Sequence, residues 1–124
     1  MDMKKAVVLV LVGLMAGAGA QAMAADDLVT AGGQAWKRLN CASCHGEDAK
    51  TPLNPEYPVL AGQHADYLRQ ALMAYQRGQK GAPASSNIRK NAVMGAMANT
   101  MSQADIDSVS VWLSRQPGPL STRK

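Results

Sequence analysis

Phenylalanine is absent from this sequence, which has only two tryptophans and three tyrosines among its 124 residues. Small domains are stabilised mainly by burying apolar side chains, so this shortage leaves little aromatic material for a core. Once a predicted leader is removed, about 100 residues remain, and a single domain is expected. A large apolar cofactor at the centre would make up for the missing side chains.

Two other patterns are missing. No stretch alternates between apolar and polar residues, so no strand is expected. No run of five or more like charges occurs, although the formal net charge is +4. Removing the leader takes away Lys4, Lys5 and Asp2, which lowers that charge to +3. Such a weak and scattered charge argues against nucleic-acid binding and favours acidic proteins or anionic surfaces as partners.

The apolar run near the start, Ala6–Ala20, is shorter than the roughly 20 residues that a membrane-spanning helix needs. Two lysines precede it, and the small-x-small sequence Ala22-Met23-Ala24 follows, as before a signal-peptidase cut. We therefore predict a cleaved signal peptide over residues 1–24. A cut after Ala20-Gln21-Ala22 and an uncleaved anchor are the alternatives. No integral membrane segment is expected after cleavage.

The remaining residues, 25–124, are predicted to form one all-α domain with a flexible tail at 118–124. Apolar residues recur at helical spacing over Asp27–Leu39 and over His64–Arg77, where Gly78 is expected to cap the second helix. Three prolines exclude a continuous helix between them. The last helix is predicted to begin at Ser102, which forms a capping-box pattern with Asp105.

The two cysteines of the chain lie in the sequence CASCH, residues 41–45. In an oxidising compartment a free dithiol would not persist. A thioredoxin-like dithiol needs a βαβ pattern, which is missing here, and a structural zinc site usually has four ligands. A disulfide between Cys41 and Cys44 would close a small, strained ring and leave His45 without a role.

Cys-x-x-Cys-His is also the attachment signature of c-type haem. Each thiol forms a thioether with one of two vinyl groups on neighbouring pyrrole rings, and the two intervening residues span the gap between those groups. The histidine that follows then supplies an axial nitrogen to the iron. This interpretation gives Cys41 and Cys44 to covalent attachment of one haem and His45 to the metal.

Three blocks carry a resemblance to a known family: CASCHG, then YPVLAGQHADYLRQALMAYQRG, then NAVMGAMANTMSQADIDSVSVWL. Their order and separations make residues 25–117 similar to a small class I cytochrome c. The chain most resembles bacterial periplasmic monohaem types and one half of the dihaem cytochrome c-four subgroup. The resemblance implies about three main helices wrapped around one covalently attached haem.

The resemblance also implies a second axial ligand, Met94, which stands eight residues before Ser102. Met97 and Met101 are alternatives, although their spacing from Met94 also suits flexible core fillers. His64 is a further alternative. In the family a proline carbonyl orients the ligating histidine, and Pro58 matches that proline.

Structural roles follow from the same resemblance. Gly33 and Trp112 are expected where the first and last helices cross closely. Trp36, Tyr57 and Tyr67 are expected to pack in the core or against the haem.

An iron with both axial positions filled can change oxidation state without bond chemistry, so the resemblance implies an electron-transfer protein rather than an enzyme. We expect a periplasmic one-electron carrier of the respiratory chain. It would bind redox protein partners through transient contacts at an exposed haem edge. It would shuttle electrons between respiratory complexes or dehydrogenases and a terminal oxidase or reductase. The alternatives are a haem c subunit of a periplasmic dehydrogenase complex and a haem peroxidase or sensor.

The protein is expected to be a monomer. Five cations are candidates for steering an acidic partner: Lys37, Arg38, Lys50, Arg89 and Lys90.

Overall fold

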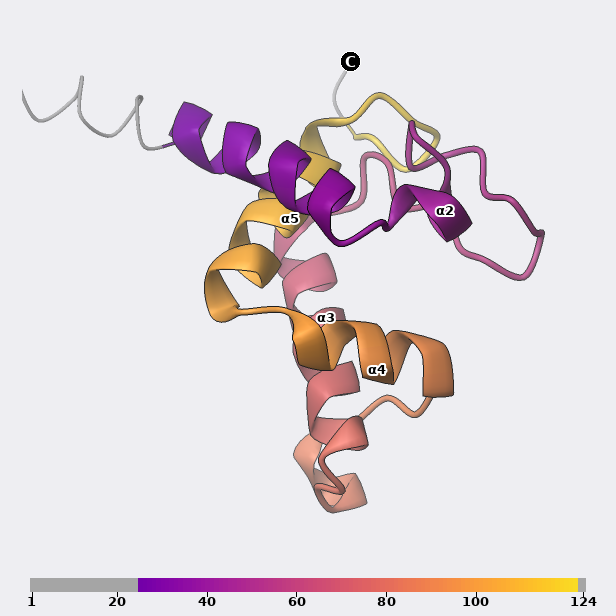
Figure 1. The fold of residues 1–124 in the computed structure, drawn as a ribbon, viewed down its shortest axis with the longest axis vertical. Coiled ribbons are helices and arrows are strands. Elements are labelled where there is room, and N and C mark those ends of the chain that lie inside the picture. The colour runs from indigo at the N-terminus through magenta and orange to yellow at the C-terminus, as the bar shows by residue number, and fades with distance from the viewer. Residues whose placement is uncertain (1–24, 123–124) are drawn as a thin grey trace, which may run out of the picture.

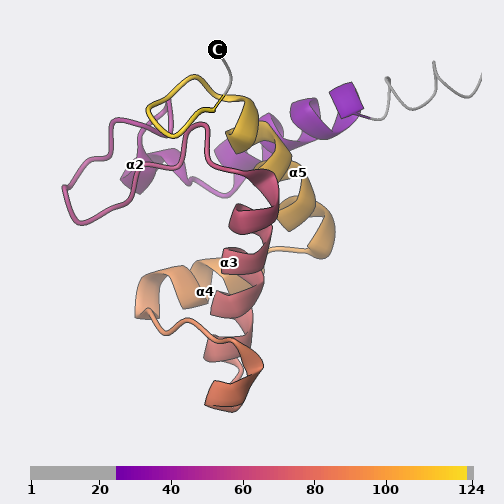
Figure 2. The same cartoon turned by 180° about the vertical axis from the view of Figure 1, so that it is seen from behind.

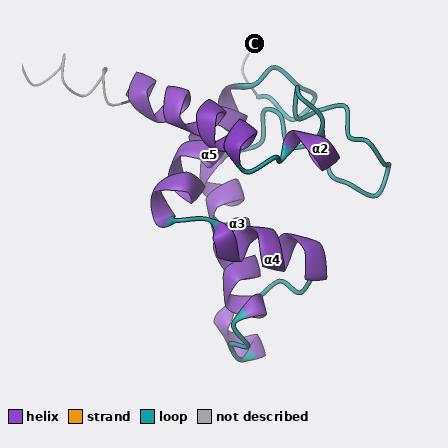
Figure 3. Cartoon of the chain, in the orientation of Figure 1, coloured by secondary structure: helices purple, strands orange, loops and turns teal. Residues whose placement is uncertain are grey.

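A computed structural model describes residues 25–122, and all regular structure in that range is helical (Figure 3). Residues 25–38 are helical throughout. The elements that follow are α2 (Ala42–His45), α3 (Ala65–Gln79), the 3-10 turn η1 (Ala84–Ser86), α4 (Ala92–Thr100) and α5 (Gln103–Arg115). The predicted all-α fold is confirmed for this part of the chain. The predicted signal peptide, 1–24, lies outside the described residues.

The helix α3 is the central element, because both α4 and α5 pack against it (Figure 1). The helix at 25–38 crosses α5 in the upper part of the view, away from α4 (Figure 1). Seen from the front and from behind, α2 and α4 lie toward the same side of α3, with α2 near its beginning and α4 near its end (Figures 1 and 2). Within residues 25–122, no helix has the length and apolar character that crossing a membrane requires.

The crossing of the first and last helices depends on two glycines. A Cβ on Gly32 would lie 2.1 Å from the Ser108 carbonyl oxygen and 2.5 Å from Trp112 Cβ. A Cβ on Gly33 would lie 3.0 Å from Trp112 Nε1. The expected contact of Gly33 with Trp112 is therefore confirmed, and Gly32 is the position with the less room. The helix propensity lost at these glycines is offset by close packing of the two backbones.

The predicted start of α5 is confirmed. The Ser102 hydroxyl accepts a hydrogen bond from the Asp105 backbone N–H, and the Asp105 carboxylate accepts one from the Ser102 backbone N–H. Each group satisfies an N–H that the first turn of a helix leaves without an internal partner.

The prediction that Gly78 caps α3 is wrong. The helix continues to Gln79, and Lys80 is its C-terminal cap. Glycine is needed at position 78 for another reason, since a Cβ there would lie 2.1 Å from the Arg89 carbonyl oxygen. The loop after α3 returns to this point, where the Arg89 N–H donates to the Ala74 carbonyl at 3.0 Å.

The sequence interpretation missed α4. The Asn91 side chain caps it by accepting a hydrogen bond from the Met94 backbone N–H at 2.9 Å. The methionines at 94, 97 and 101 have the spacing of one helical face, which was the available signal. The predicted distal ligand, Met94, therefore lies in the first turn of a helix rather than in a loop.

The buried core is small. Its larger members are Trp36, Leu68, Met101, Ile106, Val109 and Leu113, with alanines filling much of the remainder. They come from the first helix, α3 and α5, together with the residue that follows α4. The core is thin for a domain of this length, as the shortage of aromatic residues predicted.

The segment after α5 turns back toward the loop before α3. Gly118 and Ser121 approach Ala61 and Gly62 so closely that a side chain on either glycine would clash. The predicted flexible tail over 118–124 thus begins with residues that contact the body of the protein, while residues 123 and 124 lie outside the described range.

Candidate functional site

The Cys-x-x-Cys-His segment forms the single-turn helix α2 directly after the first helix. The Cys41 N–H donates to the Trp36 carbonyl at 3.1 Å, and the His45 N–H donates to the Cys41 carbonyl at 3.0 Å. This turn brings Cys41, Cys44 and His45 together. Both cysteines are partly buried, and no disulfide joins them in the described residues.

Burial raises the pKa of the Cys41 thiol. A dithiol that exchanges disulfides needs a thiol pKa below its ordinary value, because the thiolate is the nucleophile. The environment of Cys41 therefore does not favour a reactive redox dithiol.

His45 is buried, with 6 % of its surface exposed. Its Nδ1 donates to the Pro58 carbonyl at 3.1 Å. Because a carbonyl oxygen can only accept, Nδ1 carries the proton and Nε2 of the neutral ring has a free lone pair. Burial lowers the pKa of His45, more than the Pro58 carbonyl opposes, and this favours the neutral ring that can ligate a metal.

The loop between α2 and α3 carries Pro58 back to His45. It folds onto itself through hydrogen bonds from the Leu60 and Ala61 N–H groups to the Ala49 carbonyl, at 2.8 and 3.0 Å. Ala49 is fully buried. This local closure fixes where the Pro58 carbonyl lies, although Pro58 itself is exposed.

The rings around His45 are aromatic. The centroids of Trp36 and Tyr57 each lie 6.1 Å from that of His45. Trp36 is 2 % exposed, and its Nε1 is buried without a hydrogen-bond partner in the described residues. Tyr67 differs from the expectation, because it is half exposed and its hydroxyl accepts a hydrogen bond from Arg89 at 3.0 Å.

The candidate distal ligands lie in different environments. Met94 and Met97 are partly buried on α4. Met101 belongs to the apolar core and is 8 % exposed, as expected for a core filler. Sequence reasoning missed one side chain that links α3 to the end of α4. Gln76 of α3 donates to the carbonyl oxygens of Ala98 and Met101.

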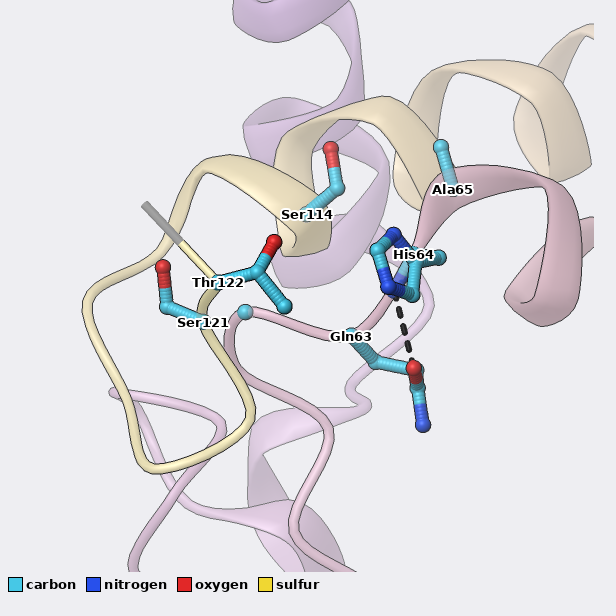
Figure 4. Close-up of a pocket in the computed structure, with 7 residues that line it drawn as sticks. Gln63, His64, Ala65, Ser114, Ser121 and Thr122 are labelled. Atoms are coloured by element: carbon cyan, nitrogen blue, oxygen red, sulfur yellow. Dashed lines mark hydrogen bonds between the residues drawn. The ribbon is translucent and has the colours of Figure 1, made fainter. Parts of the chain in front are cut away.

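His64 lies apart from these methionines. It is exposed at the N-cap of α3, where its backbone N–H donates to the Gln63 side chain at 2.9 Å (Figure 4). It lines a polar hollow of about 160 Å³ together with Ser114 near the end of α5 and Thr122 in the segment that follows (Figure 4). None of the residues of the Cys-x-x-Cys-His turn lines that hollow.

The donor set suits a c-type haem and not a metal bound by the chain alone. Among residues 25–122, no group of three or more His, Cys, Asp or Glu side chains is placed to hold a metal ion. Two cysteines three positions apart, beside one buried imidazole whose Nε2 carries a lone pair, match covalent attachment plus one ligand to the iron. The orphaned Trp36 Nε1 and the thin core also fit a large group bound beside His45.

Comparison with known proteins supports this interpretation. The family model described as cytochrome c matches residues 29–116. A thiosulfate dehydrogenase electron acceptor of Stutzerimonas stutzeri is 34% identical over 101 residues, which are 80% of this chain and 43% of that protein.

Two further relatives are cytochromes by name. Cytochrome c-554(548) of Halomonas halodenitrificans is 40% identical over 77 residues, which are 61% of this chain and 83% of that protein. Cytochrome c4 of Stutzerimonas stutzeri is 35% identical over 79 residues, which are 63% of this chain and 37% of that protein. The chain thus spans less than half the length of the first and third of these relatives and most of the second.

Proposed function

Because this chain belongs to the cytochrome c family, we propose that it is a one-electron carrier and not an enzyme. The family binds haem c covalently, and the Cys-x-x-Cys-His turn has the spacing for that attachment. The observation that carries the proposal is the buried His45, whose Nδ1 is taken by Pro58 and whose Nε2 is free.

In this proposal Cys41 and Cys44 would hold the haem through two thioethers, and His45 would ligate its iron. Pro58 keeps the imidazole in one tautomer and one orientation, as partners of metal-bound histidines generally do. Met94 would be the second side chain that ligates the iron. When bound, haem c supplies an iron that accepts and releases a single electron.

The two side chains that would ligate the iron decide between electron transfer and catalysis. If His45 and Met94 both hold the iron, no coordination position would be open for oxygen or peroxide. The thioether sulfur of methionine also favours the reduced iron relative to a second histidine. The chain therefore exchanges electrons without making or breaking bonds to a substrate.

A second candidate is a dedicated acceptor for a periplasmic dehydrogenase. It is favoured by the relative that is named as a thiosulfate dehydrogenase electron acceptor, since the alignment covers 80% of this chain. Export to the periplasm is part of both proposals and is supported by the signal-peptide pattern of residues 1–24.

Redox titration followed by absorption tests the proposed function. The purified protein should titrate as a single one-electron centre and should show the weak long-wavelength band of a methionine–ferric haem bond at neutral pH. Its absence, together with turnover of peroxide, would point to an open site and a catalytic role.

The charges of the protein are unevenly distributed along the chain. Residues 67–104 include five Lys or Arg side chains and no Asp or Glu. Arg69 pairs with Asp107, and Arg38, an earlier steering candidate, pairs with Asp105. The basic segment 77–90 keeps four cations: Arg77, Lys80, Arg89 and Lys90. We propose that this basic segment steers an acidic redox partner toward the α4 side.

Neutralising Lys80 and Lys90, which are both exposed, tests the steering. At low ionic strength, the variant Lys80→Gln/Lys90→Gln should react with anionic hexacyanoferrate at least about threefold more slowly than the wild type. The reason is that charge attraction raises association rates. The difference should vanish at high salt. Rates measured by stopped flow should not fall for cationic hexaammineruthenium.

The matched comparison is Lys37→Gln/Lys50→Gln, which removes the same charge from two other exposed steering candidates outside the basic segment. Equal slowing by both double variants would mean that the basic segment has no special part in steering.

A further inference from the structure

The side chain of Gln76 joins α3 to the end of α4. Its Nε2 donates to the Ala98 carbonyl at 2.8 Å and to the Met101 carbonyl at 3.1 Å. Because both partners can only accept, the amide must present its NH2 end to them. One partly buried side chain thus bonds to residues 22 and 25 positions further along the chain.

These two carbonyls belong to the C-terminal end of α4. The last carbonyls of a helix lack partners within the helix. At this end of α4, the Ala98 carbonyl accepts one backbone hydrogen bond, from the Met101 N–H at 3.1 Å. Gln76 supplies the donors that this end would otherwise take from water. It acts as a cap provided by a neighbouring helix.

The bonds matter because α4 is supported mainly from one side. Among α2, α3 and α5, α3 is the helix against which α4 packs extensively. The two helices also approach closely at Gly95 of α4, where an added Cβ would lie 2.7 Å from Gln79 Oε1 of α3. The Asn91 cap at the other end of α4 is local to that helix and does not attach it to α3.

From this arrangement we propose that Gln76 is a positioning residue for the distal ligand. Its hydrogen bonds hold the end of α4 against α3. They thereby keep α4, and with it Met94, at a fixed distance from the part of the molecule that contains His45. The inference rests on the proposed function, in which Met94 ligates the iron. Losing the Gln76 hydrogen bonds increases the fraction of molecules in which α4 has moved and Met94 has dissociated.

Added imidazole measures that fraction, because it binds the iron only when the methionine has left. Its apparent affinity is the intrinsic affinity multiplied by the fraction of open molecules. Gln76→Leu removes both donors, and Gln76→Glu keeps the shape but presents an acceptor to two carbonyls. Each should bind imidazole about tenfold more tightly than the wild type, since two modest hydrogen bonds are lost.

Two controls separate positioning from general stability. Gln76→Arg restores N–H donors at the same position and should stay within about twofold of the wild type. Gln70→Leu makes the same replacement at an exposed position of α3 and should also stay within about twofold. All affinities are measured on holoprotein at a temperature where far-ultraviolet circular dichroism shows full helix content.

The outcomes are distinct. Tighter imidazole binding in Gln76→Leu and Gln76→Glu, but not in Gln76→Arg or Gln70→Leu, supports the positioning role. Equal imidazole affinities in all five proteins would overturn the positioning role. So would a Gln76→Arg variant that binds imidazole as tightly as Gln76→Leu does. In both cases the methionine band of the wild type would show that the proposed ligation still holds. If the wild type itself lacks that band, the proposed ligation fails and the positioning role fails with it.

Discussion

Replacing Cys41 and Cys44 together by alanine is expected to leave little folded protein. The apolar core of the described residues contains few large side chains, and small domains are stable by only about 5–15 kcal/mol. Without thioethers the chain would lose its permanent attachment to the group that completes this core. Yield, haem content and helix content by far-ultraviolet circular dichroism measure the effect.

Two variants of the same turn are the controls. Cys41→Ala leaves one thiol for attachment and should retain a pigmented protein. Ser43→Ala changes an exposed side chain between the two cysteines and should behave as the wild type. A colourless double variant with the helix content and melting temperature of the wild type would show that the core does not depend on haem.

Replacing Met94 by alanine is expected to abolish the methionine–ferric haem band and lower the reduction potential. If Met94 ligates the iron as proposed, its thioether favours the reduced state, and removing it would leave that coordination position to water. Imidazole should then bind at least about tenfold more tightly, because no internal ligand competes with it. Absorption spectra and redox titration of the purified variant check both effects.

The neighbouring methionines provide the comparison. Met97→Ala should keep the band. Met101→Ala should also keep it but should lower the free energy of unfolding by about 2–5 kcal/mol, as buried methionines do when truncated. Loss of the band in Met97→Ala with its retention in Met94→Ala would transfer the ligand role to Met97.

The attachment turn could be predicted because its signal is local. Five consecutive residues carry the thiols, their separation and the imidazole, and α2 is the single turn that this spacing needs. The capping box of α5 is equally local, since Ser102 and Asp105 recognise each other within one turn. Such features depend little on the rest of the fold.

Features that depend on distant segments were misread or missed. Gly78 is at the end of a helical pattern, where a glycine cap and a glycine needed for packing look alike in sequence. Helix α4 has small and apolar residues around much of its surface and therefore lacks a clear charged face. The spacing of Met94 and Met97 fits one face of this helix, but in sequence it does not distinguish a helical face from core filling.

Tertiary pairing explains the remaining gaps. The Arg38–Asp105 pair joins residues 67 positions apart and removes Arg38 from the free cations. The Gln76 hydrogen bonds likewise become visible only when α3 and α4 are placed side by side. No periodicity or spacing in the sequence carries that information.

The intact mass of the denatured protein tests the central claim most directly. After denaturation in acidified organic solvent, the chain should remain heavier than its sequence by one haem, and the added mass should stay on the peptide that contains residues 41–45. A chain of unmodified mass, with the pigment extracted into the solvent or missing altogether, would contradict covalent attachment.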